Sequence, residues 1–222
     1  ISRDKSIVNW MLPFSRSCRI CPPLHQAIVL GLGVEVINAL NTPKAIRQLC
    51  DTSTALHLAC QHRASIDVIH ALLRGWPDAV HEKDRGEFTP LHLACQHGAP
   101  LAVILLLLDF WLEAANNRNG NSVESLICAR MSSDVKNVLF LVSSILNENC
   151  HNPFPHEVMS LFMSSELWNA AKIVINMYPS VTKTLKLHEK VMPDYLSVVG
   201  KCCSLTTMSM VITNEPDLLE GV

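Results

Sequence analysis

The sequence has few charged residues and no surplus of either sign. Asp, Glu, Lys and Arg together make up 17% of the 222 residues, and 18 basic against 20 acidic residues leave a formal net charge of -2. A protein that binds nucleic acid through its phosphates needs an excess of Lys and Arg on one face. The sequence therefore argues against nucleic-acid binding as the main function, and we expect no nucleic acid among the partners.

Long hydrophobic runs are absent as well. The most apolar stretch, residues 99–112, is about 14 residues long and contains Pro100 and Asp109, whereas a membrane-spanning helix needs about 20 apolar residues. The N-terminal segment has charges at Arg3, Asp4 and Lys5 and no long apolar run, so no secretory signal is recognised. We expect no membrane association. Because the sequence starts at Ile rather than Met, we expect it to be a piece of a longer protein.

Cysteine is present, but not in the pattern of a disulfide framework. The nine cysteines are odd in number and scattered, and the chain is long enough to fold without cross-links. The sequence therefore predicts thiols in a reducing, intracellular compartment, the cytoplasm. Cys18 and Cys21 leave an alternative open, a redox- or zinc-responsive switch that also uses Cys202 and Cys203. No second pair at ligand spacing supports it.

Aromatic residues are scarce at 5%, whereas apolar residues reach 49% of the sequence. The apolar side chains are mostly Leu, Ile, Val, Ala and Met, which suits packed helices and argues against a disordered chain. This composition favours an all-α protein with a substantial hydrophobic core.

The clearest positive signal is an internal repeat. The heptapeptide Leu-His-Leu-Ala-Cys-Gln-His occurs at residues 56–62 and again at residues 91–97, 35 residues apart. A related segment, Pro-Pro-Leu-His-Gln-Ala, occupies residues 22–27. Thr54 and Thr89 are placed to cap a helix, and a proline after such a residue suits the first helical position. A fixed period of about 20–50 residues predicts stacked supersecondary units.

A second element, usually marked by proline, follows each of these segments. Pro43 and Pro77 begin such elements, Leu112 takes the place of proline in the third, and later copies start at Pro179 and Pro216. Apolar residues recur at helical spacing between the two elements. Because a helix seldom continues into a proline, we predict a short helix, a turn, a longer helix and a connecting tip in each unit.

Residues 86–94, Gly-Glu-Phe-Thr-Pro-Leu-His-Leu-Ala, resemble the Gly-x-Thr-Pro-Leu-His-x-Ala signature of ankyrin repeats. The resemblance is strongest in residues 54–97 and degrades after them. It implies an ankyrin-like α-solenoid of stacked helix-turn-helix repeats with short hairpin tips. We expect an N-terminal cap or linker at residues 1–21 and an array of about four repeats at residues 22–152. Divergent helical repeats in residues 153–222 are expected to close the same array.

Polar, turn-rich segments at residues 82–87 and 116–121 are the predicted tips. In residues 116–121, Asn119 and Gly120 predict a tight hairpin turn, after which Ser122 would cap the next helix. Gly31 is expected in the turn between the two helices of the first repeat, and Gly98 in the corresponding turn of the third. Trp76 and Trp111 fall at the same point of their repeats and are expected to fill the core.

Three histidines recur with the motif, at His25, His57 and His92. The resemblance implies that they belong to a hydrogen-bond network that ties neighbouring repeats together. A metal site at His57, Cys60 and His62 is disfavoured because His62 lies about 140° around the helix from His57. No catalytic motif is recognised, so we expect no enzymatic activity, no metal and no cofactor.

The resemblance implies a protein–protein interaction scaffold that binds a partner protein through its concave face and its repeat tips, and we expect a monomer. The alternative is a regulatory or adaptor segment of a larger protein. Exposed positions of the first helices and of the tips would carry recognition. The expected partner-binding residues are Gln61, His62, Arg63, Glu82, Lys83, Asp84, Arg85, Gln96, His97, Asn117, Arg118 and Asn119.

Overall fold

The computed structural model describes residues 21–113, 120–147, 155–165 and 167–178, together with the single positions 197, 200, 209 and 213. The chain divides into two compact units, Ile1–His97 and Gly98–Val222. Within the described residues the regular structure is helical and no strand is formed, in agreement with the predicted all-α solenoid. None of the described helices is long and apolar enough to cross a membrane.

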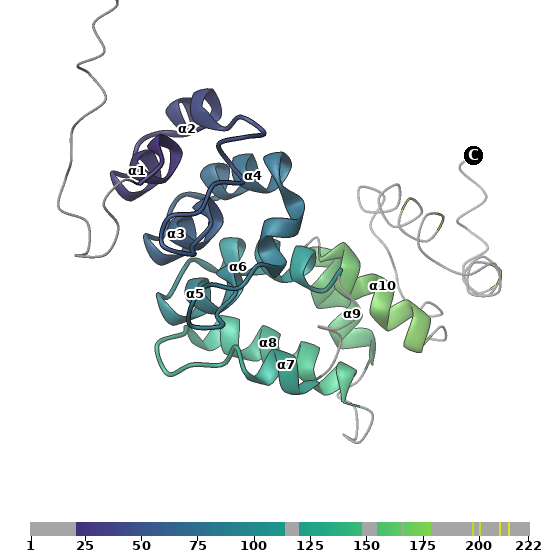
Figure 1. Ribbon diagram of the computed structural model, residues 1–222. Helices are drawn as coiled ribbons and strands as arrows, with labels where there is room; N and C mark the ends of the chain where they lie inside the picture. Colours follow the sequence, from purple (N-terminus) through teal and green to yellow (C-terminus); the bar gives the residue numbers. More distant parts are fainter. Residues whose placement is uncertain are drawn as a thin grey trace, which may run out of the picture. The chain divides into compact units, whose positions relative to one another are not determined.

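The first unit contains the short helices that begin each repeat: α1 (Pro23–Val29), α3 (Ala55–Gln61) and α5 (Pro90–Gln96). They lie side by side in chain order (Figure 1). Thr54 and Thr89 precede α3 and α5 in extended backbone, as predicted for capping residues. The starts of these helices are therefore local consequences of the repeated motif.

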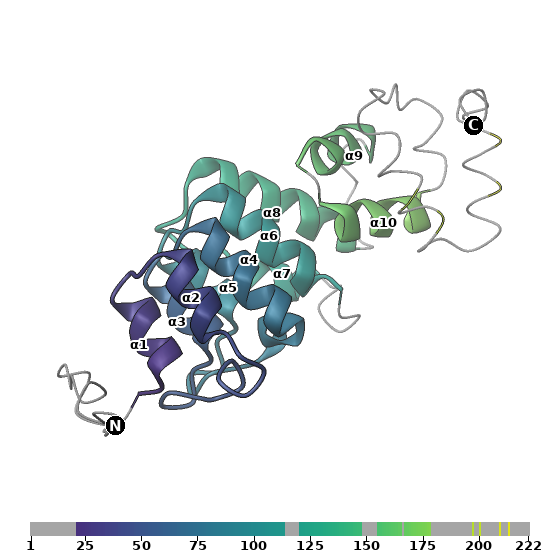
Figure 2. The same cartoon turned by 90° about the horizontal axis from the view of Figure 1, so that it is seen from above.

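The second helices of the unit form another layer, in which α2 (Val34–Leu40) lies beside α4 (Ile66–Gly75) (Figure 2). A short 3-10 helix, η2 (Pro77–His81), follows α4 at the predicted proline. Gly75 packs closely here, because a Cβ atom would lie 2.8 Å from Ile46 Cδ1 and the end of that side chain would have to shift. The prolines thus end the second helices as the sequence predicts.

The core of the first unit confirms the predicted inward positions. The equivalent leucines Leu24, Leu56 and Leu91 are at most 1% exposed. Trp76 is also buried, and the Arg47 guanidinium lies 5.1 Å from the centre of its ring. Burial of apolar side chains at one repeated position stabilises each repeat against the next.

The second unit begins with α6 (Leu101–Trp111), whose last residue, Trp111, is buried as predicted. It continues with α7 (Gly120–Glu124) and α8 (Ser133–Leu146). The predicted turn at Gly120 is wrong, because Gly120 and the residue after it are the first residues of α7. The fourth repeat lacks the Thr-Pro start that sets the first helical residue in α5, so its helix begins earlier.

The remaining described helices of this unit are α9 (Pro155–Ser164) and α10 (Trp168–Met177). A contact between distant residues joins α10 to α6. The Asp109 carboxylate accepts hydrogen bonds from the Asn169 backbone N–H at 2.7 Å and from Asn169 Nδ2 at 3.2 Å. A side chain of α6 therefore satisfies a backbone donor in the first turn of α10, a task that a local capping residue performs in most helices.

Candidate functional site

The described residues predicted to bind a partner lie mostly at the surface. Gln61, His62 and Arg63 are exposed where α3 ends, and Gln96 is exposed with a half-buried His97 where α5 ends. Residues 50–53 precede α3 and are called the first tip, and residues 82–88 precede α5 and are called the second tip. In the second tip, Glu82, Lys83 and Arg85 are exposed and Asp84 is half-buried. Asn117, Arg118 and Asn119 lie outside the described residues.

Arg63 adopts a backbone conformation that favours glycine. Its φ is 55°, and the residues that follow α1 and α5 at the corresponding position, Gly31 and Gly98, have φ of 67° and 66°. The Ala64 N–H donates to the Ala59 carbonyl at 2.9 Å and closes the end of α3. A left-handed conformation is costly for a residue with a Cβ atom. The second repeat therefore places a long cation at a point where the fold itself would favour glycine.

The second tip is organised by Asp84. Its Oδ1 atom accepts from the backbone N–H groups of Gly86 at 2.8 Å and Phe88 at 3.0 Å. Lys83 and Glu87 form an ion pair at 2.9 Å whose side chains are 58% and 78% exposed. Such an exposed pair adds little stability. Asp84 therefore shapes the tip, while the charges beside it stay open to solvent.

Sequence reasoning missed one residue of this tip. Phe88 is 43% exposed, and its ring centre lies 6.1 Å from that of His92. Exposed aromatic side chains at the centre of polar surfaces often anchor protein contacts. The signal was present in the sequence, since Phe88 stands directly before the Thr-Pro-Leu-His motif in a tip.

His57 joins the second repeat to the second tip, as predicted. The Thr54 backbone N–H donates to His57 Nδ1 at 3.2 Å, so the ring proton lies on Nε2, which donates to the Phe88 carbonyl at 3.0 Å. Burial lowers the pKa of His57, and the Phe88 carbonyl opposes that change. In the third repeat, Thr89 Oγ1 and His92 Nδ1 are 2.7 Å apart. Burial also lowers the pKa of His92. Both rings therefore hold structural roles.

The expectation that the repeated histidines join a hydrogen-bond network between repeats is not met by His25. This side chain is 0% exposed, yet neither ring nitrogen has a hydrogen-bond partner among the described residues. The residue that would cap the helix is Pro22, which lacks the hydroxyl supplied by Thr54 and Thr89. Burial lowers the pKa of His25 to about 4, and the nearby backbone of Ser53 and Gln48, which does not meet hydrogen-bond geometry with the ring, opposes this change only in part.

The expectation that Cys21 is a thiol is also wrong. Cys21 forms a disulfide with Cys50, which is 29 residues away in the sequence. Cys18, Cys202 and Cys203 lie outside the described residues, so the proposed switch of these four cysteines remains a hypothesis. No local pattern links Cys21 to Cys50, because the pairing arises only when the first repeat packs on the second.

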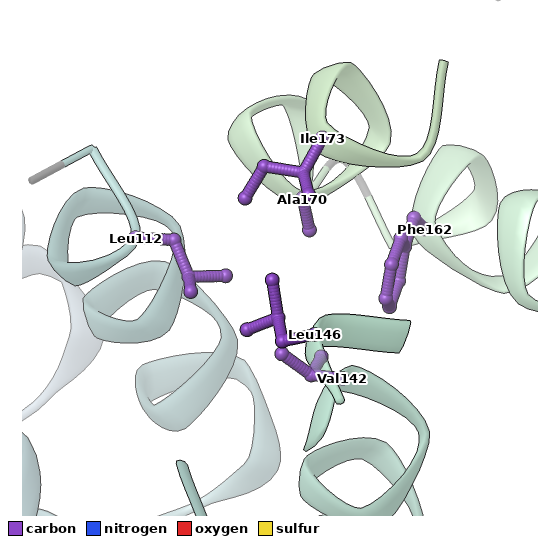
Figure 3. A pocket seen from close by; sticks show the side chains of 6 residues that line it. All are labelled: Leu112, Val142, Leu146, Phe162, Ala170 and Ile173. Atoms are coloured by element: carbon purple, nitrogen blue, oxygen red, sulfur yellow. The ribbon is translucent and has the colours of Figure 1, made fainter. Parts of the chain in front are cut away.

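A small apolar pocket lies among the described helices of the second unit. Leu112, Val142 and Leu146 face Phe162, Ala170 and Ile173 around it (Figure 3). Its volume is about 10 Å³ and its walls are apolar, so it barely reaches the size of one water molecule and offers that water no polar partner. No group of three His, Cys, Asp or Glu side chains within the described ranges could hold a metal.

The comparisons with known proteins agree with this architecture. The family model of ankyrin repeats, in three copies, matches residues 2–113 and 56–154. No curated protein and no solved structure matches the chain. The family match covers more than half of the sequence and coincides with the helix pairs of the structure. The chain therefore belongs to the ankyrin repeat family, whose members are generally protein–protein interaction modules.

Proposed function

We propose that this chain binds a partner protein through one surface of its first unit. The surface, called the recognition edge below, runs along the short helices from the second tip, which precedes α5, to the exposed C-terminal ends of α3 and α5. It contains Gln61, His62, Arg63, Gln96, His97, Glu82, Lys83, Arg85 and Phe88.

The main support for this proposal is that Arg63 adopts a left-handed backbone conformation. Strained backbone positions persist when the surrounding structure or a function maintains them. Gly31 and Gly98 show that this turn accepts glycine in the neighbouring repeats, so the arginine side chain is not needed for the turn itself. A guanidinium group there can instead form charge-assisted hydrogen bonds with carboxylate or carbonyl groups of a partner.

The second tip adds complementary features to the recognition edge. The rigid turn around Asp84 fixes the positions of its exposed charges, and Phe88 offers an apolar contact among them. A rigid scaffold with a central aromatic residue and a polar rim is typical of interaction surfaces. By this reasoning, the half-buried carboxylate of Asp84 acts through tip geometry rather than through direct contact.

The test uses Arg63→Gly, a substitution that separates folding from binding. Glycine relieves the left-handed strain at this position, so the variant is expected to be as stable as the wild type or more stable by up to about 1 kcal/mol. It should nevertheless lose partners. Binding is measured by affinity enrichment with quantitative mass spectrometry, wild type and variant in parallel, and stability by urea denaturation.

Arg85→Glu serves as a second variant on the recognition edge, and Arg74→Gly and Arg74→Glu on α4 are the matched controls. Arg74 is exposed on α4, in the other helix layer. Its substitutions therefore make the same change in charge as those at Arg63 and Arg85, but outside the recognition edge. We expect the same proteins to be lost with both edge variants and retained with the charge-matched Arg74→Glu. Equal enrichment by wild type and edge variants would contradict the proposed surface.

A further inference from the structure

The junction between the first and second repeats lacks the hydrogen-bond chain found one repeat later. Between the second and third repeats, Thr54, His57 and the Phe88 carbonyl form a continuous chain with contacts of 2.8 and 3.0 Å. At the preceding junction Pro22 replaces the threonine, and both nitrogens of the buried His25 lack partners among the described residues. Apart from apolar packing, the first junction therefore lacks the polar link that joins the next two repeats.

The Cys21–Cys50 disulfide spans this same junction. Cys21 directly precedes Pro22, as Ser53 precedes Thr54, so it occupies the corresponding point of its repeat. The two Cα atoms are 5.4 Å apart, well inside the range that a disulfide can bridge. A covalent bond thus replaces the threonine–histidine–carbonyl chain at the first junction.

Cys50 is also the first residue of the first tip (residues 50–53). The backbone groups of Cys50 and Ser53 exchange two hydrogen bonds, at 2.9 and 3.0 Å. Asp51 and Thr52 between them have φ of 51° and 71°. A two-residue turn of this type favours Asn, Asp or Gly, and a β-branched residue such as Thr52 is strongly disfavoured. The conformation of this tip is therefore imposed by its surroundings.

Two contacts impose it. The disulfide holds Cys50, and Thr52 Oγ1 accepts a hydrogen bond from the Arg85 backbone N–H at 3.1 Å. The first tip is consequently linked both to the start of α1 and to the second tip. If the cross-link opens, the strained turn loses its covalent support and the Arg85 amide loses a stably placed acceptor.

Cys21 and Cys50 are buried, but less deeply than other cysteines of the same unit. They are 8% and 9% exposed, whereas Cys60 and Cys95 are each 1% exposed. Burial raises the pKa of the Cys60 thiol, which suppresses the thiolate that reacts with disulfides. Among these four cysteines, Cys21 and Cys50 are therefore the pair nearest to solvent.

We propose that Cys21 and Cys50 form a thiol–disulfide exchange site whose oxidation state controls the order of the first tip and of the Arg85 amide. The oxidant is a low-molecular-weight disulfide of the glutathione type. One protein thiolate attacks it, forms a mixed disulfide and releases one small thiol. The other protein thiolate then displaces the second small thiol and closes the Cys21–Cys50 bond. Two protein thiols are oxidised, one external disulfide is reduced, and the two protons pass to the released thiols.

The experiment uses the full chain, equilibrated in glutathione buffers from fully reduced to fully oxidised. Acid quenching, alkylation and peptide mapping by mass spectrometry give the fraction of Cys21 linked to Cys50. Hydrogen exchange is followed in peptides that contain the first tip and Arg85. On reduction we expect exchange in both peptides to accelerate about tenfold or more. Peptides from α6 and α8 should not change.

Cys21→Ser should exchange rapidly in both buffers, whereas Cys128→Ser, a control in the other unit, should respond like the wild type. Pro22→Thr offers a rescue, because it restores a capping hydroxyl beside His25 and should reduce the effect of reduction. If Cys21→Ser folds poorly, the reduced wild-type protein gives the same measurement, because it also lacks the disulfide but carries no substitution. Failure to detect the Cys21–Cys50 link at any glutathione ratio, or unchanged exchange after its reduction, would overturn the proposal.

Discussion

Leu91→Ala is the most direct test of the stacked core. Leu91 is 0% exposed in α5, at the position that Leu24 and Leu56 occupy in their repeats. The substitution removes three carbon atoms, which corresponds to about 2.4 kcal/mol of lost burial at about 0.8 kcal/mol per group. The residual cavity adds to this, so we expect a total loss of about 3–4 kcal/mol in unfolding free energy.

Leu49→Ala is the matched control, because Leu49 loses the same atoms but is 54% exposed. Its expected cost is below about 1 kcal/mol. Urea denaturation of the full chain, followed by circular dichroism, measures both variants, and the exchange of α5 amides localises the change. A cost below about 1 kcal/mol for Leu91→Ala, or equal costs for the two variants, would refute the inward placement of the repeated leucine.

The remaining predictions concern polar contacts. Burial raises the pKa of Asp109 from 3.8 to about 6. Asp109 therefore ionises at lower pH in the unfolded chain than in the folded one, so its effect on the free energy of unfolding is most favourable below pH about 4 and is lost as pH rises through about 6. Asp109→Asn should remove this pH dependence, which is at most about 3 kcal/mol, from denaturation curves across that interval. Thr54→Val removes the hydroxyl beside His57 and should cost about 1–2 kcal/mol, whereas Thr42→Val, at an exposed position, should cost much less.

Local sequence patterns were sufficient to predict the repeated helix pairs. Capping threonines, prolines and apolar spacing act over a few residues, and each occurs at a matching point in successive repeats. The burial of Trp76 and the turn at Gly98 followed from the same comparison and are confirmed, and the structure adds that Gly98 is left-handed. The start of α7 was misplaced because the fourth repeat lacks this local signal.

The functional surface was predictable only in outline. Exposure of Arg63 and Arg85 is confirmed by the structure, but their role in binding stays a prediction. The organising role of Asp84 depends on two backbone hydrogen bonds that a charged, turn-rich segment does not specify. Phe88 stands directly before the Thr-Pro-Leu-His motif in the sequence, but whether its side chain is exposed depends on how the second tip packs against the helices.

The sequence alone determined the period, the helical class and the inward face of each repeat, because these properties arise from short-range preferences that recur along the chain. Tertiary structure alone decided which distant groups meet. The Cys21–Cys50 disulfide and the Asp109–Asn169 contact join residues 29 and 60 positions apart. The loss of partners at His25 likewise required the packed first repeat. Such pairings depend on the relative placement of whole elements, which no local pattern of residues encodes.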